Sequence, residues 1–285
     1  MITYKLCSEV TEDQIYQAFQ SGFSDYMIQL SLEKEDMLER FFGPEGNERA
    51  LSYLALDGDI GVGLVLGGIR MMNGVKTMRC GTMCINPDYR GKGVAQKLID
   101  MHIELGKSSG CHQMFLEVIN GNDRAVHFYK KNGYEIVYDL LYYNMQKETL
   151  TKMSILPIYE DYEIKQVGYY DVLSYRKTLF DMHLPWQADV EYFKTLKAKY
   201  YEAYDGDKVV AACGVFKGNV FFLHVDPQYR GLGIGMAILF EALKEDTFES
   251  VRMTINNNAN MKSFCEHIGM KKSELCQFEM YLSLR

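Results

Sequence analysis

Two glycine-rich segments are the parts of this chain whose residue types and spacing suit the binding of an anion. Asn86–Ala95 reads Asn-Pro-Asp-Tyr-Arg-Gly-Lys-Gly-Val-Ala, and Asp226–Gly235 repeats the pattern in the second half. Each segment follows an apolar run typical of a strand and opens an amphipathic helix. The first N–H groups of a helix have no intrahelical partner and attract an anion. The chain therefore looks like one anion-binding domain made twice.

The small residues and the arginine of each segment have separate roles in such a site. A tight loop that wraps a phosphate needs positive φ angles and close backbone approach, which glycine permits. Gly91, Gly93 and Ala95 meet this need in the first copy. Arg90 and Arg230 each add a positive charge. A single loop of this kind also occurs as an ordinary turn, but two copies in the same context favour a phosphate site.

Two familiar phosphate motifs are excluded by spacing. The Walker motif needs four residues between its glycines and a following Lys-Ser/Thr pair, which neither copy has. The dinucleotide fingerprint needs G-x-G-x-x-G, whereas Gln96 stands where its third glycine would be. The loop is therefore suited to a different phosphorylated ligand.

The first loop resembles the Arg/Gln-x-x-Gly-x-Gly/Ala motif with which the GNAT superfamily of acyl-CoA-dependent N-acyltransferases holds the coenzyme A pyrophosphate. The likeness continues through Met114–Ile119, Asn122, Phe128-Tyr129 and Gly133-Tyr134. The tandem arrangement is similar to two-domain bacterial members. The resemblance implies acetyl-CoA as cosubstrate and an acyltransferase of the EC 2.3.1 type. The residues it implies at the coenzyme are Cys84, Ile85, Arg90, Gly91, Lys92, Gly93, Val94, Ala95, Asn122 and Phe128.

Two residues are candidates for the chemistry of acyl transfer to an amine. The amine is mostly protonated at neutral pH, so a base is needed, and Glu117 is the candidate in its strand. An exposed strand carboxylate is the equally weighted alternative. Tyr129, which the resemblance places near the coenzyme sulfur, is the candidate acid that protonates the leaving thiolate. The resemblance implies that backbone N–H groups of Met83–Ile85 polarise the thioester carbonyl. Asp25 and Tyr26 stand where family members often gate the acceptor site.

The second half departs from the pattern at the catalytic positions. Cys265 stands where the first half has Tyr129, and Thr254 or a neighbour replaces Glu117. Asn258 corresponds to the asparagine at the pantetheine arm. We therefore expect a catalytic N-terminal domain and a degenerate C-terminal one.

The periodicity predicts a mixed α/β fold in two halves, residues 1–148 and 162–285, joined by a linker at 149–161. The resemblance implies that the two halves are tandem domains of the GNAT type. The order expected in each half is strand, two helices, three strands, the loop, helix, strand and helix. In the first half these elements are expected at 3–7, 13–20, 32–42, 51–57, 61–71, 76–85, 94–106, 113–119 and 123–132, followed by closing strands. In the second half they are expected at 162–167, 172–180, 190–199, 201–204, 209–216, 220–225, 234–243, 250–255 and 261–267.

Composition limits the classes of partner. The 285 residues are 47% hydrophobic, enough for two ordinary cores, and no apolar run has the ~20 residues of a membrane helix. A net charge of −7 argues against a general nucleic-acid surface. Seven cysteines without a C-x-x-C pair predict no metal site. We expect a cytoplasmic protein without a membrane or nucleic-acid partner, and a homodimer remains open.

Two hypotheses about function follow. In the first, the chain is an acetyl-CoA-dependent N-acetyltransferase that moves an acetyl group directly to an amine of a small molecule, peptide or protein. In the second, it is a non-catalytic acyl-CoA-binding or regulatory protein. Within the enzymes, another acyl chain or a hydroxyl acceptor stays open, because the loop recognises only the coenzyme.

Overall fold

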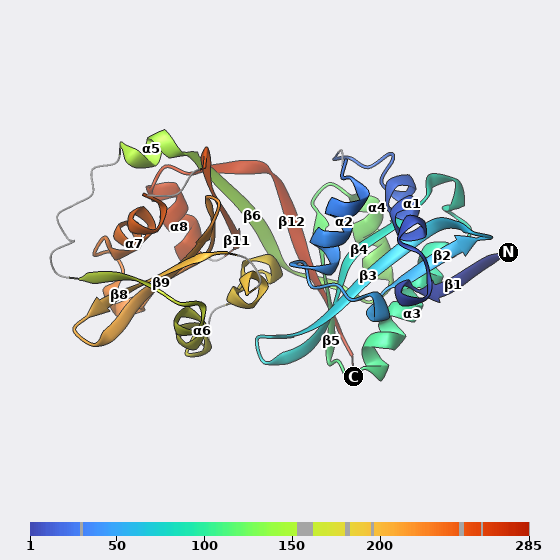
Figure 1. The fold of residues 1–285 in the computed structure, drawn as a ribbon, viewed down its shortest axis with the longest axis horizontal. Coiled ribbons are helices and arrows are strands. Elements are labelled where there is room, and N and C mark those ends of the chain that lie inside the picture. The colour runs from blue at the N-terminus through green and yellow to red at the C-terminus, as the bar shows by residue number, and fades with distance from the viewer. Residues whose placement is uncertain are drawn as a thin grey trace. The chain divides into compact units, whose positions relative to one another are not determined.

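The computed structural model describes residues 1–28, 31–152, 162–179, 183–194, 197–244, 248–257 and 259–284. Contacts divide the chain into two compact units (Figure 1). Unit 1 comprises Met1–Tyr138 together with Gln277–Arg285, and unit 2 comprises Asp139–Cys276. The predicted mixed α/β fold class is confirmed.

Unit 1 is a mixed sheet with helices on both faces. Its strands are hydrogen-bonded in the order β1-β2-β3-β4-β5-β12, and all neighbours are antiparallel except β4 and β5. The elements are β1 (Ile2–Leu6), α1 (Glu12–Gly22), α2 (Lys34–Phe42), β2 (Tyr53–Asp57), β3 (Ile60–Met72), β4 (Val75–Ile85), α3 (Val94–Ser108), β5 (Gln113–Ile119) and α4 (Asp123–Lys131), with β12 (Lys271–Ser283) contributing its last part.

Local signals in the sequence set the helix starts of unit 1. Thr11 accepts a hydrogen bond from the backbone N–H of Gln14 at 3.2 Å, and Gln14 accepts one from the Thr11 N–H at 3.0 Å. This reciprocal cap starts α1. Gly93 caps α3 in the left-handed conformation, with φ of +80°. The helix therefore begins where the glycine-rich loop ends.

Two apolar cores lie on the two faces of the unit 1 sheet. One contains α3 and α4 residues such as Leu98 and Tyr129, packed on strand residues such as Leu116. The other contains α1 and α2 residues such as Phe19 and Phe41, packed on β2 and β3. Each face of the sheet is thus closed by one pair of helices.

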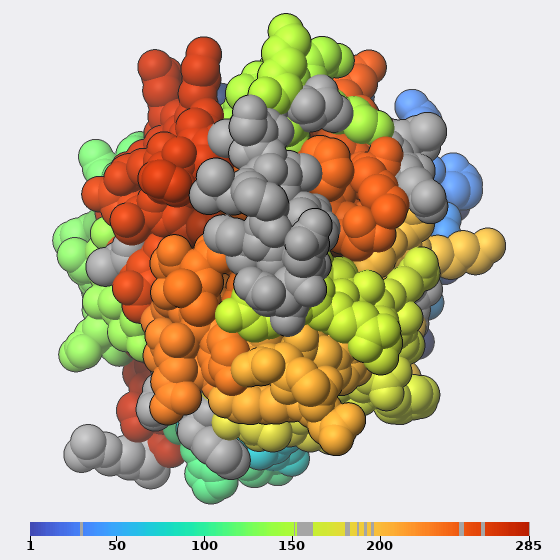
Figure 2. Space-filling view, turned by 90° about the vertical axis from the view of Figure 1, so that its left-hand side faces the viewer, coloured from blue at the N-terminus to red at the C-terminus, as the bar shows by residue number. Residues whose placement is uncertain are grey.

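Unit 2 repeats this plan. Its strand order is β6-β11-β10-β9-β8-β7, with β10 and β11 the parallel pair. Figure 2 shows the surface of the part of the chain coloured from yellow-green to red. The elements are β6 (Glu135–Gln146, from Asp139 onwards), α5 (Lys147–Thr151), β7 (Glu163–Val167), α6 (Tyr169–Lys177), β8 (Lys199–Asp205), β9 (Lys208–Phe216), β10 (Asn219–Val225), α7 (Ile234–Leu243), β11 (Ser250–Asn256) and α8 (Ala259–His267).

The unit boundary differs from the one drawn from the sequence at 148 and 162. Residues 140–146 pair with β11 in unit 2, and residues 277–283 pair with β5 in unit 1. Each sheet is therefore completed by a strand from the other half of the chain. Residues 153–161, most of the expected linker, lie outside the described part. The helix expected over 190–199 is a single 3-10 turn at Val190–Phe193, and Lys199 already begins β8.

Candidate functional site

The first glycine-rich loop has the geometry of an anion cradle. After β4, the Asn86 side chain accepts the N–H of Asp88 at 3.0 Å and closes a short turn. Gly91 and Gly93 then adopt φ of +74° and +80°. A Cβ built on either glycine meets no atom within 4 Å. Because this open space adjoins the N–H groups that start α3, the loop has the geometry to hold an anion such as a phosphate.

The second loop has the same backbone geometry. Asp226 accepts the N–H of Gln228 at 3.0 Å, and Gly231 and Gly233 have φ of +77° and +85°. A Cβ on either glycine again meets nothing within 4 Å. The sequence repeat is thus a structural repeat.

Arg90 is engaged by an acidic partner from the segment after α1. Its guanidinium forms a two-pronged ion pair with the Asp25 carboxylate, at 2.5 and 2.7 Å. Its Nε donates to the carbonyl oxygen of Ile85 at 3.1 Å. The hydrogen bond from Arg90 lowers the pKa of Asp25. A bound pyrophosphate would compete with Asp25 for the same guanidinium.

We expect Asp25→Asn to tighten coenzyme A binding about two- to fivefold, because an exposed ion pair is worth at most about 1 kcal/mol. Isothermal titration with coenzyme A measures the change. Asp13→Asn, which removes the exposed partner of Lys34 at 2.9 Å, is the matched control and should leave the affinity unaltered. Weaker binding by Asp25→Asn would show that the carboxylate assists the ligand.

A gap opens between β4 and β5 close to this loop. The two strands pair in parallel from Thr77 with Gln113 to Cys80 with Leu116, and the pairing ends there. At the same place the register of β4 against β3 shifts past Gly81. The rest of β4 stays paired with β3, but its other edge no longer pairs with β5. Met83–Ile85, whose backbone N–H groups are predicted to donate to the thioester carbonyl, lie in this part of β4.

Tyr129 lies on α4 beside the last paired residue of β4. Its side chain is 8% exposed, and its hydroxyl hydrogen-bonds with the Cys80 thiol. Its ring contacts Phe128 and Tyr134 at centroid distances of 5.5 and 5.8 Å. Burial raises the pKa of Tyr129 well above its usual value. The phenol therefore keeps its proton at neutral pH and remains a neutral hydrogen-bond donor.

The other residues expected at the coenzyme occupy defined places. Asn122 caps α4 by accepting the Ala125 N–H at 3.3 Å, and it hydrogen-bonds with Tyr26. Cys84 is buried under α1, where its thiol donates to the Ala18 carbonyl at 3.5 Å. Burial raises the pKa of Cys84 to about 12, so its thiol is no nucleophile.

Lys92 and Val94 complete the loop in different ways. The Lys92 ammonium lies over the Tyr89 ring, 5.0 Å from its centroid. Val94 is buried and anchors the start of α3 in the core.

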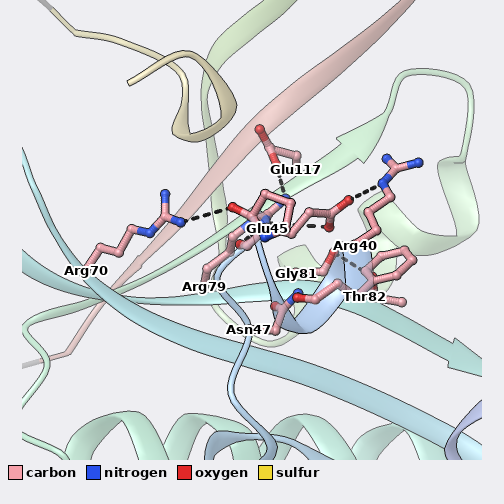
Figure 3. A network of polar contacts seen from close by, with 10 residues as sticks. Arg40, Glu45, Asn47, Arg70, Arg79, Gly81, Thr82 and Glu117 are labelled. Carbon is pink, nitrogen blue, oxygen red and sulfur yellow. Dashed lines mark hydrogen bonds and ion pairs between the residues drawn. The ribbon is translucent and has the colours of Figure 1, made fainter. Parts of the chain in front are cut away.

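Glu117 belongs to a buried polar network (Figure 3). Its carboxylate accepts a hydrogen bond from Arg79 at 2.7 Å, and both side chains are 3% exposed. Arg79 also donates to the Glu45 carbonyl at 3.2 Å, and the Glu45 carboxylate pairs with Arg40 at 2.7 Å. The alternative of an exposed strand carboxylate is therefore wrong for Glu117.

Glu117 and Tyr129 lie on opposite faces of the sheet. Leu116 and Val118 pack in the same core as Tyr129. Because successive side chains of a strand alternate, Glu117 points to the other face, where Glu45 follows α2. A thioester in the gap would have the carboxylate on one side and the phenol on the other. The sequence did not identify Arg79, Glu45 or Asn47, because no local pattern marks them as partners.

The corresponding register shift in unit 2 carries a buried aromatic residue. Pairing of β10 with β11 ends at Val220 with Met253, and a register shift follows at Phe221. Phe221 is buried and stacks on Phe193 with centroids 3.4 Å apart. Cys265 is buried with its thiol 4.0 Å from the Met253 sulfur. Asn258 lies outside the described residues.

No group of three or more His, Cys, Asp or Glu residues in the described ranges is placed to hold a metal ion. None of the helices in those ranges is both long and apolar enough to cross a membrane.

Comparisons with known proteins agree with this geometry. Residues 13–134 match the family model "Acetyltransferase (GNAT) family". Thialysine N-epsilon-acetyltransferase of Bos taurus is 39% identical over 49 residues, 17% of this chain and 29% of that protein. N-alpha-acetyltransferase 30 of Schizosaccharomyces pombe is 32% identical over 85 residues, 29% of this chain and 56% of that protein. The chain thus matches only part of the length of these relatives.

Two solved structures share the fold over nearly the whole chain. A GCN5-related N-acetyltransferase from Sphaerobacter thermophilus has a TM-score of 0.70 at 12% identity, covering 100% of this chain and 96% of that one. A tandem GNAT protein from the clavulanic acid biosynthesis pathway has a TM-score of 0.68 at 10% identity, covering 99% and 98%. At these identities the likeness shows the fold alone.

Proposed function

We propose that the protein is an acetyl-CoA-dependent N-acetyltransferase acting in unit 1, and the match of residues 13–134 to the family model "Acetyltransferase (GNAT) family" supports this proposal. The proposal depends on one observation: a glycine-rich loop with open space lies close to the point where β4 and β5 separate, and the buried phenol of Tyr129 lies at that point. Gly91 and Gly93 leave room for the pyrophosphate, and Tyr129 stands at the gap.

Each residue has one role in this mechanism. The cosubstrate supplies an activated acetyl thioester. Backbone N–H groups on the released edge of β4 polarise its carbonyl. Glu117 takes a proton from the acceptor ammonium, which leaves the nitrogen lone pair free to attack the carbonyl carbon. Tyr129 donates its proton to the sulfur as the C–S bond breaks, and the second proton lost by the attacking nitrogen restores the phenol. Over the whole reaction one proton passes to solvent.

The acceptor class follows from the relatives. The names of the partial relatives refer to the N-epsilon group of thialysine and to N-alpha groups. We therefore propose a primary amine of a small molecule, peptide or protein as the acceptor, in a protein that works in the cytoplasm.

The test is a matrix of acyl donors and acceptors. Acetyl-CoA and a longer acyl-CoA are each combined with a lysine side-chain amine, a peptide α-amine and a hydroxyl analogue, and release of the coenzyme thiol is followed with mass analysis of the product. We expect turnover with acetyl-CoA and an amine. Turnover only with the hydroxyl acceptor or only with the longer acyl-CoA would contradict the proposed reaction. Binding of acetyl-CoA without any turnover would support the non-catalytic alternative.

A further inference from the structure

The segment that follows α2 brings one polar side chain to the point where β4 and β5 separate. Asn47 is 3% exposed, and its Nδ2 donates to the Phe41 carbonyl in the last turn of α2 at 2.8 Å. Its backbone N–H donates to the same carbonyl at 3.2 Å. A Cβ built on Gly81 of β4 would overlap the Asn47 Oδ1. Asn47 is thus held by two hydrogen bonds with its oxygen directed at Gly81 (Figure 3).

The backbone on both sides of Asn47 rests directly on β3. A Cβ on Gly68 would overlap the carbonyl oxygen of Gly46, so the sheet accommodates the segment only because this side chain is missing. The Glu48 N–H donates to the Gly67 carbonyl at 2.7 Å. These contacts fix the place of the Asn47 amide relative to the sheet.

A second oxygen lies next to Gly81, where the strand gap begins. Pairing of β4 with β5 ends at Cys80, and the register of β4 against β3 skips Gly81. Thr82 pairs with Leu66, which packs in the core of α1 and α2, so the Thr82 side chain projects from the face on which Asn47 lies. Its hydroxyl donates to the Gly81 carbonyl at 2.8 Å. The hydroxyl hydrogen is thereby used, and the Thr82 Oγ1 is left as an acceptor.

The Asn47 oxygen lacks a donor. Among the residues that the structure describes, none forms a hydrogen bond with this buried Oδ1. Asn132 makes the same kind of contact at the end of α4, where its Nδ2 donates to the Phe128 carbonyl at 2.8 Å, but its Oδ1 accepts from the Gln96 Nε2 at 2.6 Å. A buried acceptor without a donor is costly, and a group of a bound ligand would satisfy it. The Asn47 oxygen therefore points to a ligand that carries an N–H or O–H group.

The side of the sheet favours the acceptor substrate over the coenzyme sulfur as this ligand. Asn47 and Thr82 lie on the face that also carries Glu117, whereas Tyr129 packs in the core of the opposite face. In the proposed transfer the sulfur lies beside Tyr129, and the acceptor amine loses a proton to Glu117. The attacking nitrogen is therefore the group that meets the two oxygens at Gly81.

An amine suits these oxygens better than a hydroxyl does. An ammonium that has given one proton to the base keeps two N–H groups on the attacking nitrogen. A hydroxyl that has lost its proton keeps no donor. A site built to bind an N–H group rejects an analogue without it, because the polar atoms of the site are then left unpaired.

We propose that Asn47 is a specificity-determining residue that selects a primary amine as the acceptor in unit 1: its Oδ1 and the Thr82 Oγ1 accept the two N–H groups that remain on the attacking nitrogen. This inference rests on the proposed function. Asn47 and Thr82 hold the nitrogen and take no proton from it, so the bonds made and broken are those of the proposed transfer.

The test measures how strongly the full chain prefers a primary amine to its N-methyl derivative, which has one N–H group fewer. The probes are the lysine side-chain amine, the peptide α-amine and the N-methyl derivative of each. In Asn47→Leu the ratio of kcat/KM for the primary and methylated amines should fall at least about tenfold, because a hydrogen bond to a charged or reacting group is lost. In Thr82→Val, which keeps the shape of the side chain, the ratio should fall about threefold or more. Thr82→Val tests the same site should Asn47→Leu not fold.

Asn132→Leu is the matched control. It also removes a hydrogen bond from a side-chain amide to a carbonyl at the end of a helix. Its oxygen already has a donor in Gln96, so we expect the preference for the primary amine to stay at the wild-type ratio. The coenzyme A affinity, measured by calorimetric titration, should stay within about twofold in all three variants.

Two results would overturn the proposal. Equal losses of kcat/KM for the primary and methylated amines in Asn47→Leu would show a role in packing, with a water molecule as the partner of the oxygen. A weaker coenzyme A affinity with an unchanged preference would show that an amide of the coenzyme is the partner.

Calorimetric titration of the coenzyme A complex with the same amines gives a readout that does not depend on turnover. If the wild type acetylates none of the amines but its complex binds a primary amine, at least about tenfold more weakly in Asn47→Leu, the proposed function fails while the amine site stands. If the wild type is active and Asn47→Leu keeps the preference, the amine site fails alone. A complex that binds none of the amines, in a protein without turnover, would contradict both.

Discussion

Replacing Tyr129 by phenylalanine should lower kcat about a hundredfold, since general acid catalysis by a positioned side chain contributes roughly 10²–10⁴-fold. The affinity for coenzyme A should change little, because the ring remains packed between Phe128 and Tyr134. Steady-state thiol release and calorimetric titration measure the two quantities separately. The variant keeps its fold because only one buried hydroxyl, bonded to Cys80, is removed.

Tyr134→Phe is the matched control. Tyr134 is 1% exposed, its ring lies 5.8 Å from that of Tyr129, and its hydroxyl is buried. Loss of this hydroxyl should leave kcat within about twofold, because the residue has no role in the proposed transfer. Equal losses in the two variants, or an unchanged rate in Tyr129→Phe, would remove the phenol from the mechanism.

Gly93→Trp should weaken coenzyme A binding at least about a hundredfold. The side chain would occupy the open space beside the loop, and the loss of two charge-assisted hydrogen bonds of about 1.5 kcal/mol each corresponds to that factor. The φ of +80° adds strain to any residue with a Cβ. Calorimetric titration gives the affinity, and circular dichroism shows whether the fold is retained.

The second loop supplies the control for this variant. Gly233 has φ of +85° and equal open space, so Gly233→Trp introduces the same strain and bulk in unit 2. We expect it to retain turnover, because Cys265 stands in unit 2 where unit 1 has the proposed acid Tyr129. If Gly233→Trp lost turnover while Gly93→Trp kept full activity, unit 2 rather than unit 1 would be the catalytic unit.

The sequence predicted those features of the candidate site that depend on neighbouring residues. The loop around Gly91 and Gly93 follows from spacing alone, because positive φ and a helix start are local properties. The predicted strand 113–119 coincides with β5, and the helix predicted over 123–132 ends one residue beyond α4. The predicted resemblance to the GNAT superfamily is confirmed, because residues 13–134 match its family model.

The parts that escaped prediction depend on contacts between distant segments. Glu279 lies opposite Glu117 only through the pairing of β12 with β5, across most of the chain. Arg79 and Glu45 meet because the segment after α2 lies against β4, and no periodicity marks such a pair. The sequence also did not predict that β6 pairs with β11 and β12 with β5, because a strand pattern does not identify the strand with which it pairs. Asp25 was noted as a possible amine contact, whereas its partner in the structure is Arg90.

The most direct test of the account is a crystal structure of the protein with coenzyme A. The account predicts the pyrophosphate on the N–H groups of the loop from Arg90 to Ala95. It also predicts the coenzyme sulfur in the gap between β4 and β5, within hydrogen-bond reach of the Tyr129 hydroxyl. Coenzyme bound only at the loop after Arg230, or a sulfur remote from Tyr129, would contradict it.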